Sequence, residues 1–133
     1  MIFRSTWGRF VPVTLVMGLI FFLSNQSGAS LPLPDIPNID KVAHFLIYAL
    51  LAAAALYAFP EPVRRRRAYF VGVLVILLCV LYGITDEFHQ SFIPGRCVSG
   101  WDLLADTVGA VAMVLGWRYW RSSSLTRKKL RLG

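Results

Sequence analysis

The ionisable residues that could carry out chemistry in this chain are concentrated in short stretches. One of them, GITDEFHQSFIPGR, combines two acids, a histidine, an amide and an arginine: Asp86, Glu87, His89, Gln90 and Arg96. Histidine exchanges protons near neutral pH, carboxylates bind divalent cations, and the planar guanidinium of arginine pairs with phosphate or carboxylate groups. The stretch therefore predicts a site for an anionic ligand, a metal ion or a proton-transfer reaction.

A second stretch, DKVAHFLIYALL, places polar residues at helical spacing. Asp40, His44 and Tyr48 follow one another at intervals of four. Lys41 lies three residues before His44, so on a helix all four side chains form one stripe. Asp40 also suits a helix N-cap. His44 lies within an apolar run, where an ionisable group normally faces a bundle interior or a wet cavity; a hydrogen bond to a neighbouring helix is the structural alternative.

The two acids of the first stretch differ in the direction that they face. Asp86, His89 and Gln90 share one helical face. Glu87 points roughly 100° away from it, so a solvated acid suits Glu87 better than Asp86. Both acids lie near the end of a helix, where the macrodipole disfavours negative charge. We therefore expect a cation, a basic side chain or a bound ligand to stabilise them.

The residues that follow predict a turn and a further helix. Pro94 and Gly95 are typical of a turn that returns Arg96 toward the bundle, where it suits a phosphate or an ion pair with Asp86 or Asp102. The next stretch, SGWDLLADTVGAVAMVLG, offers Asp102 as an N-cap, with Asp106 one turn deeper on the same face. Gly109 and Gly116 on that helix allow close packing against a neighbour.

We predict that these stretches form one shared site, closed by polar residues at the end of the first apolar run. The candidate catalytic residues are His44, Asp86, His89 and Asp102. The candidate substrate-binding residues are Asp40, Lys41, Tyr48, Glu87, Gln90, Arg96, Asp106, Ser24 and Gln26. The spacing dictates no metal-ligand set, although Asp86, His89, Asp102 and Asp106 together could hold a divalent metal ion.

The elements that must position these residues are apolar helices. Hydrophobic residues make up 56% of the chain and are concentrated in four runs, at about 7–26, 40–59, 69–90 and 102–121. A helix needs about 20 residues to cross the hydrocarbon core of a membrane. Residues 1–133 therefore predict a single all-α membrane domain, a four-helix transmembrane bundle. A soluble bundle is disfavoured because few positions remain for a polar outer face.

Basic residues are sorted to one side of these runs. All of them except Lys41 and Arg96 lie before or at the start of the first run, between the second and third, or at the end of the fourth and beyond it, where residues 122–133 form a basic tail. The positive-inside rule makes that side and both termini cytoplasmic. Topology accounts for the net charge of +7, so nucleic acid binding is not predicted. Residues 1–29 also resemble a secretory signal, with small residues at Ser27 and Ala29; its cleavage would leave three spans.

The cysteines are expected to be unpaired. Cys79 lies within the third apolar run, and Cys97 lies in the loop that follows it. A disulfide between them would require a residue in the middle of the membrane to move by about 15 Å or more.

At these residues the chain resembles the VanZ-like family of small bacterial integral membrane proteins. The resemblance depends on FFLSNQ, on DKVAHFLIYALL and on TDEFHQSFIPGRCVSGWDLLADTVGAVAMVLG, and covers the four runs without the basic tail. The positions that match the polar motifs of the family are Asp40, Lys41, His44, Asp86, Glu87, Gln90, Arg96 and Asp102. The family commonly has asparagine at the position of Asp106, so this chain carries an additional acid there.

The resemblance implies a multi-pass protein of the bacterial cytoplasmic (inner) membrane, related to a protein associated with resistance to the glycopeptide antibiotic teicoplanin. It implies no particular reaction. We expect the site to bind, and in one version of the hypothesis to modify, an anionic lipid or lipid-linked cell-envelope precursor at the extracytoplasmic face. Lys41 and Arg96 would hold phosphate, and His44 or His89 would exchange protons.

Several alternatives remain open from the sequence. As an enzyme the protein would be a lipid-phosphate hydrolase or transferase. As a non-catalytic protein it would alter the availability of a lipid or drug at the cell surface. A homo-oligomer could act as a small transporter, and the polar pairs could instead serve only to assemble the helices.

Overall fold

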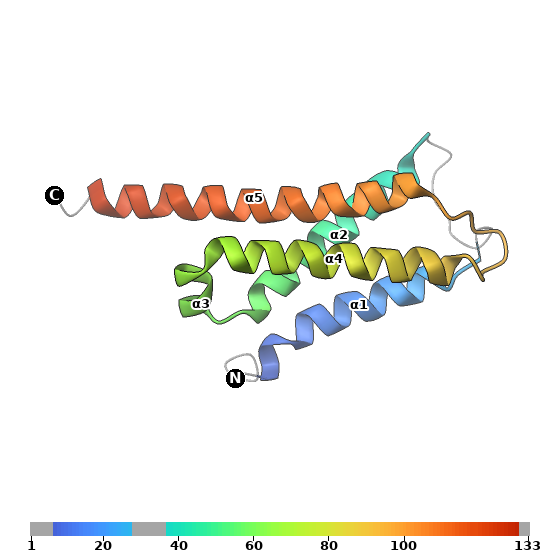
Figure 1. Cartoon of the computed structure of the whole chain (residues 1–133), viewed down its shortest axis with the longest axis horizontal. Coiled ribbons are helices and arrows are strands. Elements are labelled where there is room, and N and C mark those ends of the chain that lie inside the picture. Colours follow the sequence, from blue (N-terminus) through green and yellow to red (C-terminus); the bar gives the residue numbers. More distant parts are fainter. Residues whose placement is uncertain (1–6, 28–36, 131–133) are drawn as a thin grey trace.

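The computed structural model in Figure 1 describes residues 7–27 and 37–130, and within these ranges every element is a helix. The elements are η2 (Trp7–Arg9), α1 (Val11–Ser24), α2 (Ile39–Ala58), α3 (Glu61–Arg66), α4 (Ala68–Gln90) and α5 (Gly100–Leu130). The prediction of an all-α fold is confirmed. The predicted cleavage region around Ala29 lies outside the described residues.

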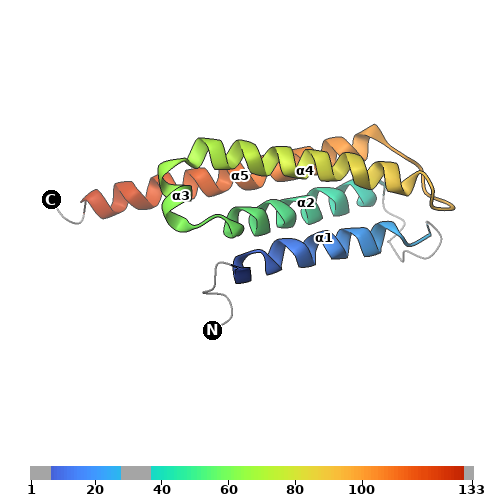
Figure 2. The same ribbon diagram turned by 60° about the horizontal axis from the view of Figure 1, so that its bottom comes forward.

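Four of the helices pack side by side. α2 makes its most extensive contact with α5, which also packs against α4, and α1 lies against α2 and α4 on the side away from α5 (Figures 1 and 2). Side chains without solvent exposure fill the interior, among them Tyr48, Leu51, Val71 and Ala110. The antiparallel order of the helices brings the ends of α1 and α4 and the starts of α2 and α5 to one end of the bundle (Figure 1).

Apolar side chains also cover the outside of the bundle. Leu15, Leu46 and Leu81 are 67%, 59% and 63% exposed, a pattern that a bundle surrounded by lipid can accommodate. Three segments are long and apolar enough to cross a membrane: Trp7–Ser24, Ile39–Ala58 and Ala68–Gln90. α5 is not among them, because Asp102 and Asp106 in its first two turns lower its mean hydropathy. A fourth span at α5 stays a prediction.

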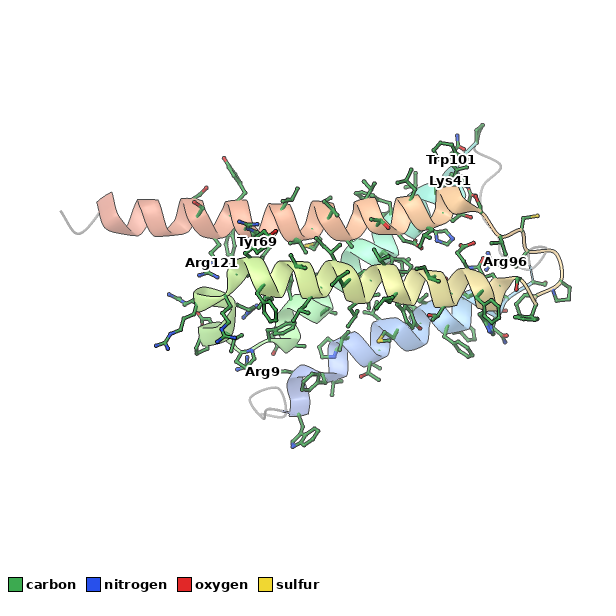
Figure 3. The ribbon with its side chains drawn as sticks, viewed as in Figure 1. Arg9, Lys41, Tyr69, Arg96, Trp101 and Arg121 are labelled. Atoms are coloured by element: carbon green, nitrogen blue, oxygen red, sulfur yellow. The ribbon has the colours of Figure 1, made fainter. Side chains whose placement is uncertain are left out.

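All described basic residues except Lys41 and Arg96 lie at one end of the bundle. This end is opposite to the one where α1 and α4 end and α2 and α5 begin. Figure 3 shows Arg9 and Arg121 at one end, and Lys41 and Arg96 at the other. Arg121 donates hydrogen bonds to the backbone carbonyls of Arg64 and Arg65 at the end of α3, the latter at 2.7 Å. The basic residues are therefore sorted to one end of the bundle, as the sequence predicts. That this end faces the cytoplasm stays a prediction.

Two predicted helix caps are wrong. α2 begins at Ile39 after Asn38, whose φ of 62° is left-handed, so Asp40 lies inside the first turn and does not cap it. Asp102 also lies inside the first turn of its helix, because its backbone N–H already donates to the Ser99 carbonyl, 3.0 Å away. Both acids still face the positive end of a helix dipole.

The two glycines of α5 have different surroundings. A Cβ added at Gly109 would lie 3.0 Å from the backbone carbonyl carbon of Phe45 and nearer still to its oxygen. Nothing in the described part of the chain lies within 4 Å of a Cβ at Gly116. The prediction of close packing is right for Gly109 and wrong for Gly116, so α2 crosses α5 at the earlier glycine.

The expectation for the cysteines is confirmed. Cys79 is buried in α4 and Cys97 is exposed in the loop after it, and both are free thiols. Cys79 acts as a small apolar residue of the core.

Candidate functional site

An ion-pair network joins the starts of α2 and α5. The ammonium group of Lys41 lies 2.7 Å from Asp40 Oδ2 and 2.7 Å from Asp102 Oδ1. Asp102 is buried, while Asp40 remains half-exposed. Lys41 therefore neutralises an acid of each helix, and its position is fixed by both.

One turn deeper, a histidine meets a buried acid. His44 Nδ1 lies 2.9 Å from Asp106 Oδ1, and the Asp106 side chain is 0% exposed. Asp106 Oδ2 has no hydrogen-bond partner among the described residues. A Cβ at Gly83 would lie 3.1 Å from that oxygen, so the glycine in α4 makes room for the carboxylate. The expectation that His44 faces the bundle interior is confirmed, and its bond to Asp106 of α5 is also the hydrogen bond to a neighbouring helix that was the structural alternative.

A separate polar contact joins α4 to α1. The side-chain amide of Gln90 donates to Ser24 Oγ at 3.3 Å and to Asp86 Oδ2 at 3.1 Å. All three side chains belong to buried residues. Asp86 therefore faces α1 and is held by an amide rather than by a cation.

Glu87 faces the other way, toward the start of α5. Its Oε2 accepts a hydrogen bond from the Ser99 backbone N–H at 2.9 Å. Its Oε1 is buried and has no partner in the described part of the chain. Asp86 and Glu87 are both 6% exposed, so the alternative of a solvated Glu87 is wrong. The Ser99 backbone bonds with this acid, and ligand atoms of His44 and Asp102 lie within 4.8 Å of it, which helical spacing alone could not show.

A tight turn directs Arg96 back to the bundle. The Arg96 backbone N–H donates to the Ile93 carbonyl at 3.2 Å, and Gly95 has a φ of 75°. Proline followed by a residue with positive φ at the two central positions is typical of a type II turn. The prediction that Pro94 and Gly95 turn the chain is confirmed.

Arg96 ends at the last turn of α1. Its Nε donates to the Gln26 carbonyl at 3.1 Å, and its Nη2 donates to the Leu23 carbonyl at 2.7 Å. A cation is favoured there by the negative end of the helix dipole. The alternative of an ion pair with Asp86 or Asp102 is wrong, because neither acid pairs with Arg96.

A cavity of about 160 Å³ lies beside these groups, between α1, α2 and α4. Its polar lining comes from Ser24, Asp40, His44, Tyr48, Asp86, Gln90 and Arg96. Its apolar lining comes from Ile20, Leu23, Ala43 and Ile47. The cavity thus combines residues from distant parts of the sequence, although neither Lys41 nor Asp102 lines it.

The metal-ligand set suggested by the sequence is not brought together. His89 turns to α1, where its ring packs 4.9 Å from the ring of Phe21, centroid to centroid. A different set does converge: His44, Glu87 and Asp102 each offer a ligand atom within 4.8 Å of the others. These residues come from α2, α4 and α5.

Sequence reasoning missed several residues that shape the site. Ser99 contributes only its backbone N–H, and Gly83 contributes only space. Ala43 and Ile47 each precede a polar residue of the predicted stripe, and Ile20 lies one turn before Ser24. Ala43 and Ile47 are four residues apart, as are Ile20 and Ser24, and this spacing is a usable signal because helical residues four apart share one face.

The fold and the site define a helical membrane protein with a buried polar cluster at one end of its bundle. The model of the VanZ/LLP1 family matches residues 8–121, and the chain belongs to that family. The match ends at Arg121, which agrees with a resemblance that excludes the basic tail.

One relative is a protein of Schizosaccharomyces pombe named "Uncharacterized protein C11E3.10", which is 32% identical over 109 residues. The match covers 80% of this chain and 64% of the relative, so the chain spans less than two thirds of the length of that protein. No solved structure matches the chain. Because a match comes from a yeast, family membership alone does not assign the chain to a bacterial membrane.

Proposed function

We propose that this protein binds the phosphate-bearing headgroup of an anionic lipid, or of a lipid-linked cell-envelope precursor, in the cavity between α1, α2 and α4. The observation that carries the proposal is the composition of the cavity wall. Ile20, Leu23 and Ile47 form an apolar side, while His44 and Arg96 belong to the polar side. A lipid presents the same combination, because its chains are apolar and its headgroup is charged.

Arg96 is the group that we assign to the phosphate. A guanidinium has five N–H donors, and the contacts with Leu23 and Gln26 use one from Nε and one from Nη2. The remaining donors can form charge-assisted hydrogen bonds with phosphate oxygens. Lys41 takes no part in this proposal, because two carboxylates already hold it and it does not line the cavity.

The acids on the wall restrict the kind of headgroup. Asp86 would repel a ligand that presented only phosphate, whereas Lys41 already neutralises Asp40. Ionised carboxylates accept hydrogen bonds from hydroxyl groups, so a glycerol or sugar next to the phosphate would suit them. Tyr48 lines the same cavity with a buried hydroxyl that has no partner among the described residues, and it can donate one further hydrogen bond.

The proposal includes an orientation. The cavity lies at the end of the bundle opposite to Arg9 and Arg121 (Figure 3), and the positive-inside rule makes this end extracytoplasmic. With α5 as the fourth span, the protein would be a multi-pass protein of the bacterial cytoplasmic membrane. The lipid would then bind from the outer leaflet.

A substitution that fills the cavity tests the proposal without removing a charge. Ala43 lines the cavity, and Leu46 on the same helix is 59% exposed and does not. We expect the purified wild type and Leu46→Phe to retain an anionic lipid in native mass spectrometry, and Ala43→Phe to retain it at least about tenfold less. Phosphate release from the retained lipid would distinguish an enzyme from a non-catalytic binding protein.

Two results would contradict the proposal. One is equal retention of anionic lipid by Ala43→Phe and Leu46→Phe when both variants show the helix content of the wild type. The other result is that, in nanodiscs containing both lipids, phosphatidylcholine replaces the anionic lipid in the site and the site stays equally occupied.

A further inference from the structure

The ends of α2, α4 and α5 enclose more buried negative charge than the described cations compensate. Glu87 and Asp102 are each 6% exposed, and Asp106 is fully buried. Of these three acids, Asp102 pairs with Lys41, and Asp106 bonds with a histidine. Among the described residues, the hydrogen bond that Glu87 accepts comes from a backbone N–H and not from a cation. An ionised carboxylate that is buried without a counter-ion is strongly destabilising, so a bound cation would stabilise this cluster.

We propose that His44, Glu87 and Asp102 bind one divalent transition-metal ion, of the Zn²⁺ or Mn²⁺ type. Each residue offers a ligand atom within 4.8 Å of the other two. The second, independent observation is Glu87 Oε1, which belongs to a side chain more than nine-tenths buried and has no partner among the described residues. A metal ion would provide that partner.

Each proposed ligand keeps one polar atom free, and His44 and Glu87 are oriented through their other one. Asp106 contacts Nδ1 of His44 at 2.9 Å, which leaves Nε2 for a metal ion. The Ser99 N–H binds Oε2 of Glu87 and leaves Oε1. Lys41 binds Oδ1 of Asp102 and leaves Oδ2. Carboxylate and backbone partners of this kind orient metal ligands and set the histidine tautomer.

The ligand types favour a transition metal over magnesium or calcium. Imidazole binds Zn²⁺ and similar ions well, whereas Mg²⁺ and Ca²⁺ prefer oxygen ligands alone. Ligands at about 2.1 Å from such an ion lie roughly 3 to 3.5 Å apart. Because the ligand atoms now lie within 4.8 Å of one another, only a small inward rotation of the side chains is needed to bind the ion. Of the three proposed ligands, only His44 lines the cavity between α1, α2 and α4.

Lys41 should compete with the metal ion. Its ammonium group lies 2.7 Å from Asp102 and repels any cation bound to the same carboxylate. Removal of this charge should therefore strengthen metal binding. A purely structural role for the acids predicts no such gain.

The inference is independent of lipid binding, because the metal can be measured in detergent without any lipid ligand. The experiment uses full-length protein treated with a chelator and then titrated with Zn²⁺ or Mn²⁺. We expect one equivalent per chain by elemental analysis. Glu87→Gln should weaken binding at least about tenfold, while Asp86→Asn, the neighbouring acid with the same 6% exposure, should bind like the wild type.

Two further readouts keep the test decisive. Lys41→Met should bind the metal more tightly than the wild type, and added metal should raise the Tm of the wild type and of Asp86→Asn. The inference is wrong if the wild type retains no stoichiometric Zn²⁺ or Mn²⁺. It is also wrong if Glu87→Gln and Asp86→Asn lose affinity equally, or if Lys41→Met weakens binding. If Glu87→Gln does not fold, the effect of added metal on the Tm of Asp86→Asn and the metal affinity of Lys41→Met decide the question.

Discussion

The crossing of α2 and α5 at Gly109 offers a sharp prediction about stability. Gly109→Ala places a methyl group against the Phe45 backbone carbonyl, 3.0 Å from its carbon and nearer to its oxygen. A backbone cannot rotate away as a side chain can, so the two helices must separate. Overpacking of this kind costs about 1–3 kcal/mol, whereas alanine in place of glycine favours a helix by about 1 kcal/mol.

Gly116→Ala is the matched control, because it lies on the same helix with nothing described within 4 Å of the added atom. Both variants gain the same helix propensity, so the difference between them isolates the packing cost. That difference of about 1–3 kcal/mol corresponds to a Tm of Gly109→Ala roughly 3 to 9 °C below that of Gly116→Ala. Thermal unfolding in detergent, followed by circular dichroism, measures it. Equal Tm values would refute the close crossing of α2 and α5.

Three other predictions concern exposure and charge. A membrane-impermeant maleimide added to intact cells should modify Cys97, which is exposed, and leave buried Cys79 unmodified; protection of both until the cells are lysed would reverse the proposed orientation. Asp106→Leu should lower the Tm by more than Asp106→Asn, because only the amide can still bond with the buried histidine, and equal losses would contradict this role. The Arg65 guanidinium lowers the pKa of Glu61 below its usual 4.5, so any stability from this pair is present above that pH and lost as the pH falls. Because both side chains are more than half exposed, the Tm of Glu61→Gln should match that of the wild type from pH 7 down to pH 4.5, and a divergence would contradict this assignment.

Much of the candidate site could be predicted from spacing within single helices. Asp40, His44 and Tyr48 do lie along one helix, and His44 does face the interior. The stripe was readable because a period of 3.6 residues relates sequence to helix face directly. The same rule could not place Glu87, because its surroundings come from the Ser99 backbone and from His44 and Asp102 on other helices.

Partners across helices were not predictable in the same way. Arg96 suited a phosphate or an ion pair with Asp86 or Asp102, and it donates to the carbonyls at the end of α1 without pairing with either acid. Asp86, His89 and Gln90 do share one face, toward α1, but the packing of His89 on the ring of Phe21 was not predictable. Each outcome depends on the rotation and depth of one helix relative to another, which no single segment encodes.

The sequence by itself determined the helices, the turn at Pro94 and Gly95, and the sorting of basic residues, because apolar length, proline and glycine geometry and charge act locally along the chain. The tertiary structure alone decided that His44, Glu87 and Asp102 meet and that a cavity opens beside them. The physical reason is that these arrangements depend on the atomic contacts between helices that are far apart in the sequence. Where Gly109 lets α5 approach the backbone of α2, the register of the two helices is fixed, and with it the set of buried charges that must share one space.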